Sequence, residues 1–292
     1  MRDEMETNEP SRRAWITGAG GLIGHCLANA KTPGSAQFEI IPLTRPMLDL
    51  TDLASVENRF HADRPALVIH CAALSQSAAC QANPALAKKI NVEATAHLAA
   101  LAAEADFIFF STDLVFDGRK GNYIETDPVN PLSVYAETKA QAEQIVLTNP
   151  RHTVIRASLN SGASPNGTSA CNVQMQAAWK KGRAVKLFFD EFRCPIPASV
   201  TARAVWELAG QRQSGLYHLA GSERLSRAAI GELAAGRHPE LKPRIETCSL
   251  REYRGAPRPA DVSLNCAKIQ KLLSFPLPGL AQYLRDHPEE PF

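Results

Sequence analysis

Long hydrophobic runs are missing from this sequence. No apolar segment approaches the roughly 20 residues that a membrane-spanning helix needs. Residues 1–10 have no apolar core that could serve as a signal peptide. We therefore expect a soluble, cytoplasmic protein in which residues 1–12 form a disordered leader. The net charge is only +2, which argues against nucleic acid or a membrane surface as a partner.

The sequence also lacks the spacings of disulfide-rich and metal-binding proteins. Its seven cysteines are scattered, odd in number and without a C-x-x-C pair. Its eight histidines show no metal spacing such as H-E-x-x-H. We expect reduced, mostly buried cysteines and predict no metal-binding residue. The 292 residues, 45% apolar and 21% charged, suit an ordinary globular protein, for which we expect two lobes.

The stretch from Thr17 to Gly24 is rich in glycine and predicts a strand-to-helix turn. It follows the apolar run 14–16, and Gly18, Gly21 and Gly24 are spaced three apart. Glycines there let the chain approach a pyrophosphate, which then meets the N–H groups at the start of the next helix. The pattern favours a dinucleotide-binding site, although an ordinary loop explains the glycines about equally well when they are considered alone.

Strand-like and helix-like segments alternate along the first half of the chain. The predicted strands are 14–16, 38–43, 66–70, 107–110 and 153–156, and the predicted helices are 22–30, 53–60, 84–104 and 135–147. Such alternation demands a parallel sheet with right-handed crossovers. The expected fold class is α/β, a doubly wound parallel sheet of the Rossmann type with a smaller C-terminal substrate-binding lobe.

Beyond Ser158 the alternation loosens. Residues 160–168 are rich in turn formers and indicate a loop into a second lobe. The segments predicted after it are helices at 173–182, 201–208, 226–235 and 266–273 and strands at 185–189 and 215–219. We expect residues 13–158 to form the dinucleotide-binding domain. Residues 159–292 are expected to form mainly the substrate-binding lobe, with segments near 196–220 returning to the sheet.

A tyrosine and a lysine four residues apart carry the clearest chemical signal. Tyr135 and Lys139 fall on one face of a predicted helix. A nearby ammonium lowers the ordinary phenol pKa of about 10, so we expect Tyr135 to act as general acid toward a carbonyl that receives hydride. Ser111 and Thr112 end the preceding strand and supply a further hydroxyl. The alternative is a capping hydroxyl with a surface tyrosine and lysine.

The residues after the second predicted strand bear on the choice of cofactor. Folds that prefer NAD place an acidic side chain there, about twenty residues past the glycines, to bind the ribose hydroxyls. Here Thr44 and Arg45 occupy that position, and an arginine suits a 2′-phosphate. We expect NADP(H) as the preferred cofactor and NAD(H) as the second candidate. An exposed arginine in a loop is the alternative explanation.

A longer set of motifs resembles one protein family. The run 111–118, S-T-D-L-V-F-D-G, is its most specific piece. The other matches are Tyr123, Glu125, 127–128, 131–132, 135–139, 43–45, 48–52, 217–221, 258–259 and 263–264. Through these motifs the chain resembles the dTDP-4-dehydrorhamnose reductase-like family, within the extended short-chain dehydrogenases/reductases, over nearly its whole length from Arg13.

The resemblance implies an NAD(P)H-dependent reductase of the 4-keto group of a nucleotide-bound 6-deoxysugar. Thr112, Tyr135 and Lys139 fall on the family's catalytic positions. The implied cofactor contacts are Gly18, Gly21, Leu22, Ile23, Gly24, Arg45, Asp49, Leu50, Cys71, Ala72, Ala73, Asn91, Tyr135 and Lys139. The implied substrate contacts are Ser111, Asp113, Val115, Phe116, Asn160, Arg193 and Arg258. The two arginines are candidates for the diphosphate, and a solvated surface charge is the alternative for each.

Two departures from the family pattern fall on the substrate side. The family usually continues Arg-Thr-Ser-Trp where residues 156–159 read R-A-S-L, so aromatic residues expected near the sugar are missing. Residues 190–197 are also more charged than the usual stretch. A different ketosugar or another carbonyl substrate therefore stays open. A nucleotide sugar is the expected small-molecule partner, and a homodimer is a candidate assembly.

Two other functions are compatible with these motifs. The non-catalytic beta subunit of methionine adenosyltransferase looks similar across them. A regulatory subunit of that kind would hold the cofactor and use its altered substrate lobe to bind a partner protein. An epimerase or dehydratase is disfavoured by the S-T-D run and by the absence of a neighbouring acid pair suited to elimination.

Overall fold

The computed structural model describes residues 12–163, 165 and 170–292. Residues 1–11 of the expected leader and residues 164 and 166–168 of the expected loop lie outside the described residues. Within the described part, no helix is long and apolar enough to cross a membrane. The same part contains no group of three or more His, Cys, Asp or Glu side chains that could hold a metal ion.

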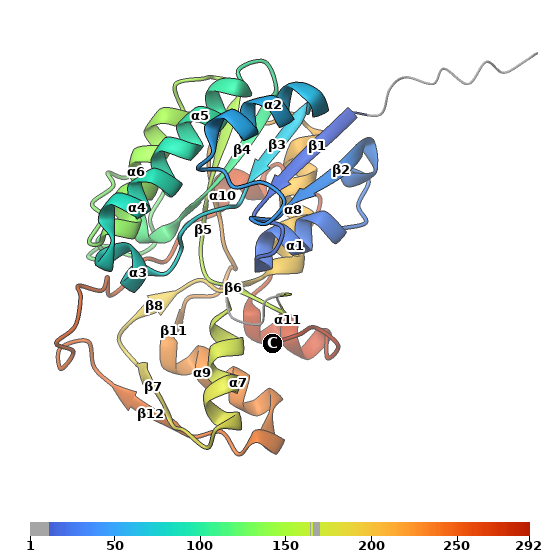
Figure 1. The fold of residues 1–292 in the computed structure, drawn as a ribbon. Coiled ribbons are helices and arrows are strands. Elements are labelled where there is room, and N and C mark those ends of the chain that lie inside the picture. Colours follow the sequence, from blue (N-terminus) through green and yellow to red (C-terminus); the bar gives the residue numbers. More distant parts are fainter. Residues whose placement is uncertain (1–11, 164, 166–169) are drawn as a thin grey trace, which may run out of the picture.

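A six-stranded parallel sheet forms the centre of the molecule (Figure 1). Its strands are β1 (Arg12–Thr17), β2 (Phe38–Leu43), β3 (Leu67–His70), β4 (Asp106–Thr112), β5 (His152–Ala157) and β10 (Gly215–Leu219). They lie in the order β10-β5-β4-β3-β1-β2. Because the chain goes from β1 to β2 on one side and returns to β3 on the other, the fold is the predicted doubly wound, Rossmann-type sheet. Such sheets bind ligands where the carboxyl ends of β1 and β3 meet.

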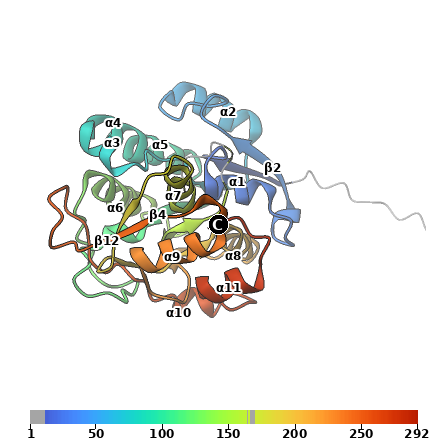
Figure 2. The same ribbon diagram turned by 90° about the horizontal axis from the view of Figure 1, so that it is seen from below.

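Helices cover both faces of this sheet (Figures 1 and 2). They are α1 (Leu22–Asn29), α2 (Leu53–Asp63), α5 (Ala94–Leu101), α6 (Val134–Val146), α8 (Ala198–Gly210) and α10 (Ala267–Gln270). Successive strand residues point to opposite faces. Trp15 of β1 therefore packs in the cluster that contains side chains of α2, α5 and α6, whereas Ile16 packs with Trp206 in the cluster that contains α1, α8 and α10.

One predicted helix is interrupted. The segment predicted at 84–104 consists of α4 (Pro84–Lys88), a π-helical turn η2 (Lys89–Glu93) and α5. A further helix, α3 (Ser77–Ala82), precedes it where none was predicted. π-Helical turns inside α-helices are rare and often occur at functional sites. Asn91 lies within this one.

Short elements form the C-terminal part, below the sheet in Figure 1. They are β6 (Asn160–Ser161), α7 (Cys171–Lys180), β7 (Val185–Phe188), β8 (Phe192–Arg193), β9 (Ile196–Pro197), β11 (Leu225–Ser226), α9 (Arg227–Arg237), β12 (Ile245–Cys248) and α11 (Leu280–Asp286). Strand β11 pairs with β8, β12 with β7 and β6 with β9. Helix α11 was not predicted. In contrast to these elements, β10 joins the large sheet beside β5, and α8 packs against α1.

Candidate active site

The glycine-rich turn brings the end of β1 against the segment that follows β3. Gly18 has a φ of +70°, and a Cβ added there would lie 2.7 Å from the backbone nitrogen of Ala72. A Cβ on Gly24 would collide with the carbonyl oxygen of Gly18. The Gly21 amide donates to that same oxygen at 2.9 Å. Side chains at these positions would force the turn open. The glycines therefore leave the backbone N–H groups at the start of α1 uncovered, and such groups attract anions.

Asn91 holds the segment after β3 in place. Its side-chain oxygen accepts from the Leu74 amide at 2.8 Å, and its nitrogen donates to the Leu74 carbonyl at 3.1 Å. The same nitrogen donates to the Thr138 hydroxyl at 3.0 Å. Asn91 is only 1% exposed. The Asn91 amide thus fixes residues 71–74 against α6, and a contact between Asn91 and the cofactor stays a prediction.

His70 ends β3 in a buried position that the sequence analysis did not assign to the site. Its Nδ1 lies 2.7 Å from the Thr17 hydroxyl and its Nε2 lies 3.0 Å from the Thr95 hydroxyl. Burial and, to a lesser extent, the charge of Lys139 together lower the pKa of His70 to about 3. Burial raises the pKa of the adjacent, half-buried Cys71 thiol, with Lys139 acting in the opposite direction. His70 is thus a neutral hydrogen-bonding link between β1 and α5.

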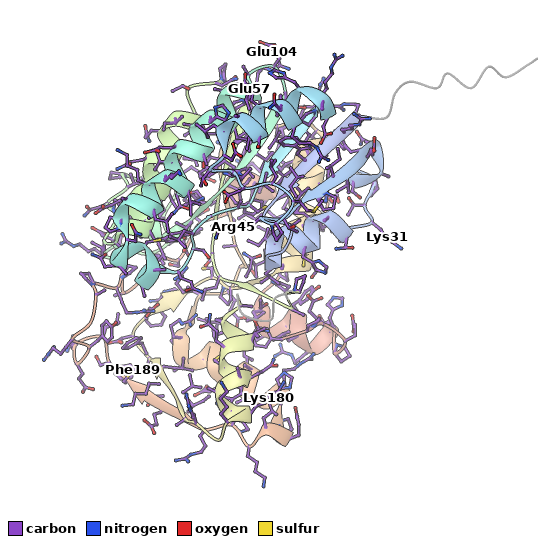
Figure 3. The ribbon with its side chains drawn as sticks, in the orientation of Figure 1. Lys31, Arg45, Glu57, Glu104, Lys180 and Phe189 are labelled. Atoms are coloured by element: carbon purple, nitrogen blue, oxygen red, sulfur yellow. The ribbon has the colours of Figure 1, made fainter. Side chains whose placement is uncertain are left out.

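Arg45 lies exposed just after β2 (Figure 3). Its side chain is 80% exposed, and its Nε is 3.8 Å from Asp49 Oδ2. The amide and hydroxyl of Thr51 donate to the other Asp49 oxygen, and these hydrogen bonds hold the pKa of Asp49 below its ordinary value. An ion pair this exposed is weak, so the guanidinium is available to a phosphate. Leu22 is buried, and Ile23 and Leu50 are half-buried in the adjoining cores.

Strand β4 delivers three polar residues at its carboxyl end. The Thr112 hydroxyl donates to Asp113 Oδ1 at 3.3 Å and accepts from the Leu114 amide at 3.2 Å. Asp113 is fully buried, and its Oδ2 accepts from Arg193 Nε at 2.8 Å. Because Arg193 belongs to β8, this ion pair ties the C-terminal part to the end of β4. The buried Ser111 hydroxyl has no hydrogen-bond partner among the described residues.

Tyr135 and Lys139 both lie on α6, beside the end of β4. Burial and the negative charge of Asp113 raise the pKa of Tyr135 to about 12, against a hydrogen bond with the Thr112 side chain that lowers it. Burial lowers the pKa of Lys139 to about 7. In this structure the pKa of the phenol is therefore raised and not lowered, and burial leaves the lysine itself only partly charged at neutral pH.

Two expected substrate contacts are part of the core. Val115 ends the 3-10 turn η3 (Asp113–Val115), and both Val115 and Phe116 are 0% exposed. The Phe116 ring stacks on Tyr123 with centroids 4.0 Å apart. The chain turns inward after β4, so both side chains are buried in this structure and support the following loop, and a substrate contact of these two residues stays a prediction.

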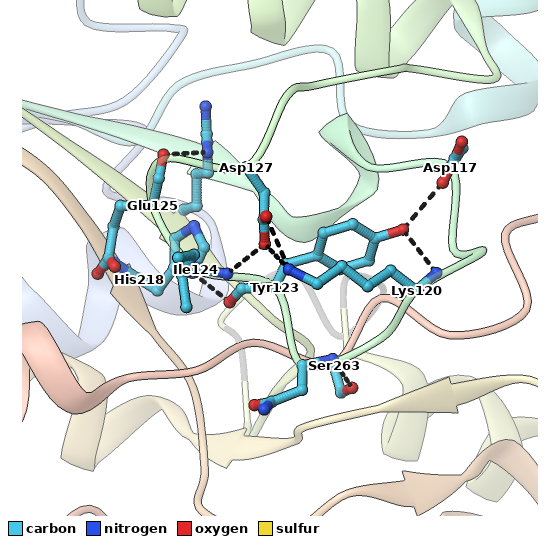
Figure 4. Close-up of polar contacts among 10 residues, drawn as sticks. Asp117, Lys120, Tyr123, Ile124, Glu125, Asp127, His218 and Ser263 are labelled. Atoms are coloured by element: carbon cyan, nitrogen blue, oxygen red, sulfur yellow. Dashed lines mark hydrogen bonds and ion pairs between the residues drawn. The ribbon is translucent and has the colours of Figure 1, made fainter.

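The loop 117–127, which carries several motif residues, is held from both ends (Figure 4). The Tyr123 hydroxyl donates to Asp117 Oδ1 at 2.8 Å. The backbone amide of His218, on β10, donates to Glu125 Oε1 at 3.0 Å. These contacts give Tyr123 and Glu125 a structural role next to the catalytic candidates.

The remaining expected substrate contacts lie in the C-terminal part. Arg258 donates from Nε and from a terminal nitrogen to the two carboxylate oxygens of buried Glu191 at 2.8 and 2.9 Å. The Asn160 side-chain oxygen accepts from the Thr201 hydroxyl at 2.7 Å. Arg258 and Arg193, expected to bind a diphosphate, are thus both paired with carboxylates, and their positive charges are already offset.

Comparison with known proteins gives a family match over almost the whole chain. The model of the RmlD substrate binding domain matches residues 12–289. Methionine adenosyltransferase 2 subunit beta of Mus musculus is 29% identical over 288 residues, which cover 92% of this chain and 85% of the relative. The dTDP-4-dehydrorhamnose reductase of Sinorhizobium fredii is also 29% identical over 288 residues, covering 94% of this chain and 95% of the relative.

Solved structures agree with this match at the level of the fold. The Bacillus anthracis dTDP-4-dehydrorhamnose reductase in complex with NADP has a TM-score of 0.86 at 22% identity, covering 94% of this chain and 98% of that chain. The Thermus thermophilus UDP-glucose 4-epimerase complex with NAD has a TM-score of 0.73 at 21% identity, covering 89% and 91%. Because the family model spans nearly all of the sequence, the chain belongs to the RmlD substrate binding domain family of extended short-chain dehydrogenases/reductases.

Proposed function

We propose that this chain is an NAD(P)H-dependent reductase of a keto group on a nucleotide-activated deoxysugar. The observation that carries the proposal is that Tyr135 interacts with Thr112, which ends β4, while Lys139 lies one turn further along the same helix over Phe109 of β4. A phenol, a hydroxyl and an ammonium together form a site that can protonate a carbonyl oxygen. In this proposal residues 13–158 bind the cofactor, with segments near 196–220 completing the sheet, and most of residues 159–292 bind the substrate.

The bare glycine turn supports a dinucleotide as the cofactor. Gly18 and Gly24 leave no room for a Cβ, which is the form a turn takes where backbone N–H groups approach a pyrophosphate. The residues that would hold the cofactor are Gly18, Gly21, Leu22, Ile23, Gly24, Arg45, Asp49, Leu50, Cys71, Ala72 and Ala73. Exposed Arg45 would bind the 2′-phosphate of NADP. When bound, NAD(P)H supplies the hydride.

Tyr135 is suited to donate its proton only after hydride transfer to the substrate carbonyl has begun. With a pKa of about 12 it stays protonated at neutral pH, so it can donate only when the carbonyl oxygen has become strongly basic during reduction. The Thr112 side chain lies near enough to the phenol to affect its pKa, and in this proposal it orients the hydroxyl. Lys139 adds positive charge near the developing oxyanion whenever it is protonated. Together the three side chains stabilise negative charge on the substrate oxygen.

The proposal is tested by following NADPH oxidation with a panel of nucleotide 4-keto-6-deoxysugars. Tyr135→Phe should abolish turnover on the sugar that the wild type reduces while leaving NADPH binding intact. Tyr283→Phe removes a phenolic hydroxyl from distant α11 and should leave turnover unchanged. Full activity in Tyr135→Phe would refute the assigned role.

The cofactor preference has its own test. Removing the guanidinium in Arg45→Ala should weaken NADPH binding and leave NADH binding unchanged, because only NADPH carries the 2′-phosphate. Both affinities can be measured by quenching of protein fluorescence. Equal losses of affinity for NADPH and NADH would show that Arg45 supports the loop and does not bind the 2′-phosphate.

A regulatory subunit is the second candidate. Similarity to a methionine adenosyltransferase beta subunit is as high as similarity to a reductase, and Arg193 and Arg258 are engaged by carboxylates. Tight NADPH binding without turnover on any sugar, together with co-purification of a methionine adenosyltransferase, would favour this candidate over the reductase.

A further inference from the structure

A third charged residue shares the face of α6 that carries Tyr135 and Lys139. Glu143 follows Lys139 by four residues, so the two side chains lie one turn apart on the same face. Glu143 is 0% exposed and Lys139 is 2% exposed. Charged groups are almost never buried this completely without a partner, so the partner of each one matters.

The partner of Glu143 is Arg156 on β5. Arg156 Nε lies 3.1 Å from both Glu143 carboxylate oxygens, and a terminal nitrogen donates to Oε2 at 2.7 Å. Arg156 is itself 3% exposed. It donates to the Glu125 carbonyl at 3.4 Å, and its guanidinium lies 5.1 Å from the Phe116 ring centroid. Phe116 and Glu125 of the following loop therefore both contact the guanidinium that pairs with Glu143.

Lys139 has a different environment. Its Nζ lies 3.9 Å from the ring centroid of Phe109 on β4. The titratable and charged groups that interact with it are Glu143 on α6 and His70 and Cys71 at the end of β3. Arg156 pairs with Glu143, and Cys80, Asp113 and Arg193 interact with Tyr135, which lies one turn before Lys139 on α6. Glu143 is the buried carboxylate one turn from Lys139 on the same helix, and its charge raises the pKa of the lysine against the larger effect of burial.

We propose that Glu143 is a positioning residue for the reaction, which supplies the buried negative charge that keeps Lys139 protonated while Arg156 holds that charge in place. The proposal rests on the reductase function proposed above. Both carboxylate oxygens of Glu143 accept hydrogen bonds from Arg156. Glu143 therefore influences Lys139 by its electrostatic field and does not accept a proton from it. Tyr135, Lys139 and Glu143 then form one functional row along α6.

The effect has a defined direction. Burial lowers the pKa of Lys139 to about 7, and the charge of Glu143 opposes this shift. Without that charge the pKa would fall further, and most of the lysine would be neutral at pH 7. A neutral amine cannot stabilise a developing oxyanion by charge, so Glu143 affects catalysis without touching substrate.

The direct test is a titration of Lys139 without substrate or cofactor. The 13Cε resonances of 13C-labelled lysine are followed from pH 5 to 10, with Lys139 assigned from the Lys139→Met variant. Glu143→Gln should lower the midpoint of Lys139 by about 1 pH unit, because a nearby opposite charge shifts a pKa by 1–3 units. Glu137→Gln removes an exposed carboxylate from the same helix and should leave the midpoint in place. An unchanged or raised midpoint in Glu143→Gln, or an equal shift in Glu137→Gln, overturns the proposal.

A double variant covers the case in which Glu143→Gln does not fold. Replacing a buried ion pair by apolar residues of similar size is often neutral or stabilising. Glu143→Leu combined with Arg156→Met should therefore fold and show a midpoint that is also lowered, but by less than in Glu143→Gln, which leaves the Arg156 cation unpaired. A wild-type midpoint in this variant also overturns the proposal. The titration needs no turnover. The two experiments can therefore fail independently, and an inactive protein in the reductase assay does not affect the titration result.

Discussion

Replacing the buried lysine by an apolar residue should stabilise the fold while it removes activity. The pKa of Lys139 falls from 10.5 to about 7 on folding because of burial. This difference of roughly 3.5 corresponds to about 5 kcal/mol at 1.36 kcal/mol per pKa unit, which is an upper bound on the cost of burying the ammonium. Lys139→Met fills the same space over Phe109 without a charge. After loss of the cation–π contact, worth about 1–2 kcal/mol, we expect a net stabilisation of roughly 2–4 kcal/mol at pH 7.

The pH dependence gives this prediction a sign that can be checked. A lysine with a lowered pKa in the folded state binds fewer protons there than in the unfolded state between about pH 7 and 10.5. The amount by which Lys139 lowers the free energy of unfolding is therefore largest below pH 7 and declines as the pH rises. Urea unfolding of wild type and Lys139→Met at pH 7, 8 and 9 should show a stability difference that shrinks by about 1.4 kcal/mol per pH unit. A variant less stable than wild type at pH 7, or a difference that does not change with pH, would refute the reasoning.

Two further predictions concern the turn and the second buried ion pair. Gly24→Ala should lower stability by about 1–3 kcal/mol and weaken NADPH binding in a thermal-shift titration, because its Cβ would collide with the Gly18 carbonyl. Gly20→Ala, whose Cβ would meet its nearest atom at 3.8 Å, is the matched control and should retain both properties; equal losses would contradict the steric argument. Arg193→Leu should destabilise the chain by about 3–5 kcal/mol in urea because it leaves Asp113 buried without its cation. Adding Asp113→Leu should recover most of that loss, and a double variant as unstable as the single one would speak against the ion-pair account.

Much of the architecture was predictable from local patterns. Strands β1 to β5 are short apolar runs, and their alternation with helices requires a parallel sheet whatever the rest of the chain does. The glycines of the first turn indicate close backbone approach because other residues cannot adopt a φ of +70° without strain. The spacing of Tyr135 and Lys139 places them on one face of any helix that contains both. The interruption of the helix at Asn91 was not predictable, because an alanine-rich segment shows the same periodicity with or without a π-helical turn.

By itself the sequence determined the alternation of strands β1 to β5 with helices, the bare backbone at the first turn and the shared helix face of Tyr135 and Lys139, because each depends on residues close together in the chain. Only the tertiary structure decided which side chains face a ligand and which charges are paired. Val115, Phe116 and Asn91 are buried in the protein, and Glu143 meets Arg156 across two elements. The pKa values of Tyr135 and Lys139 also depend on it, since burial is the largest cause of both shifts and is set by residues distant in sequence.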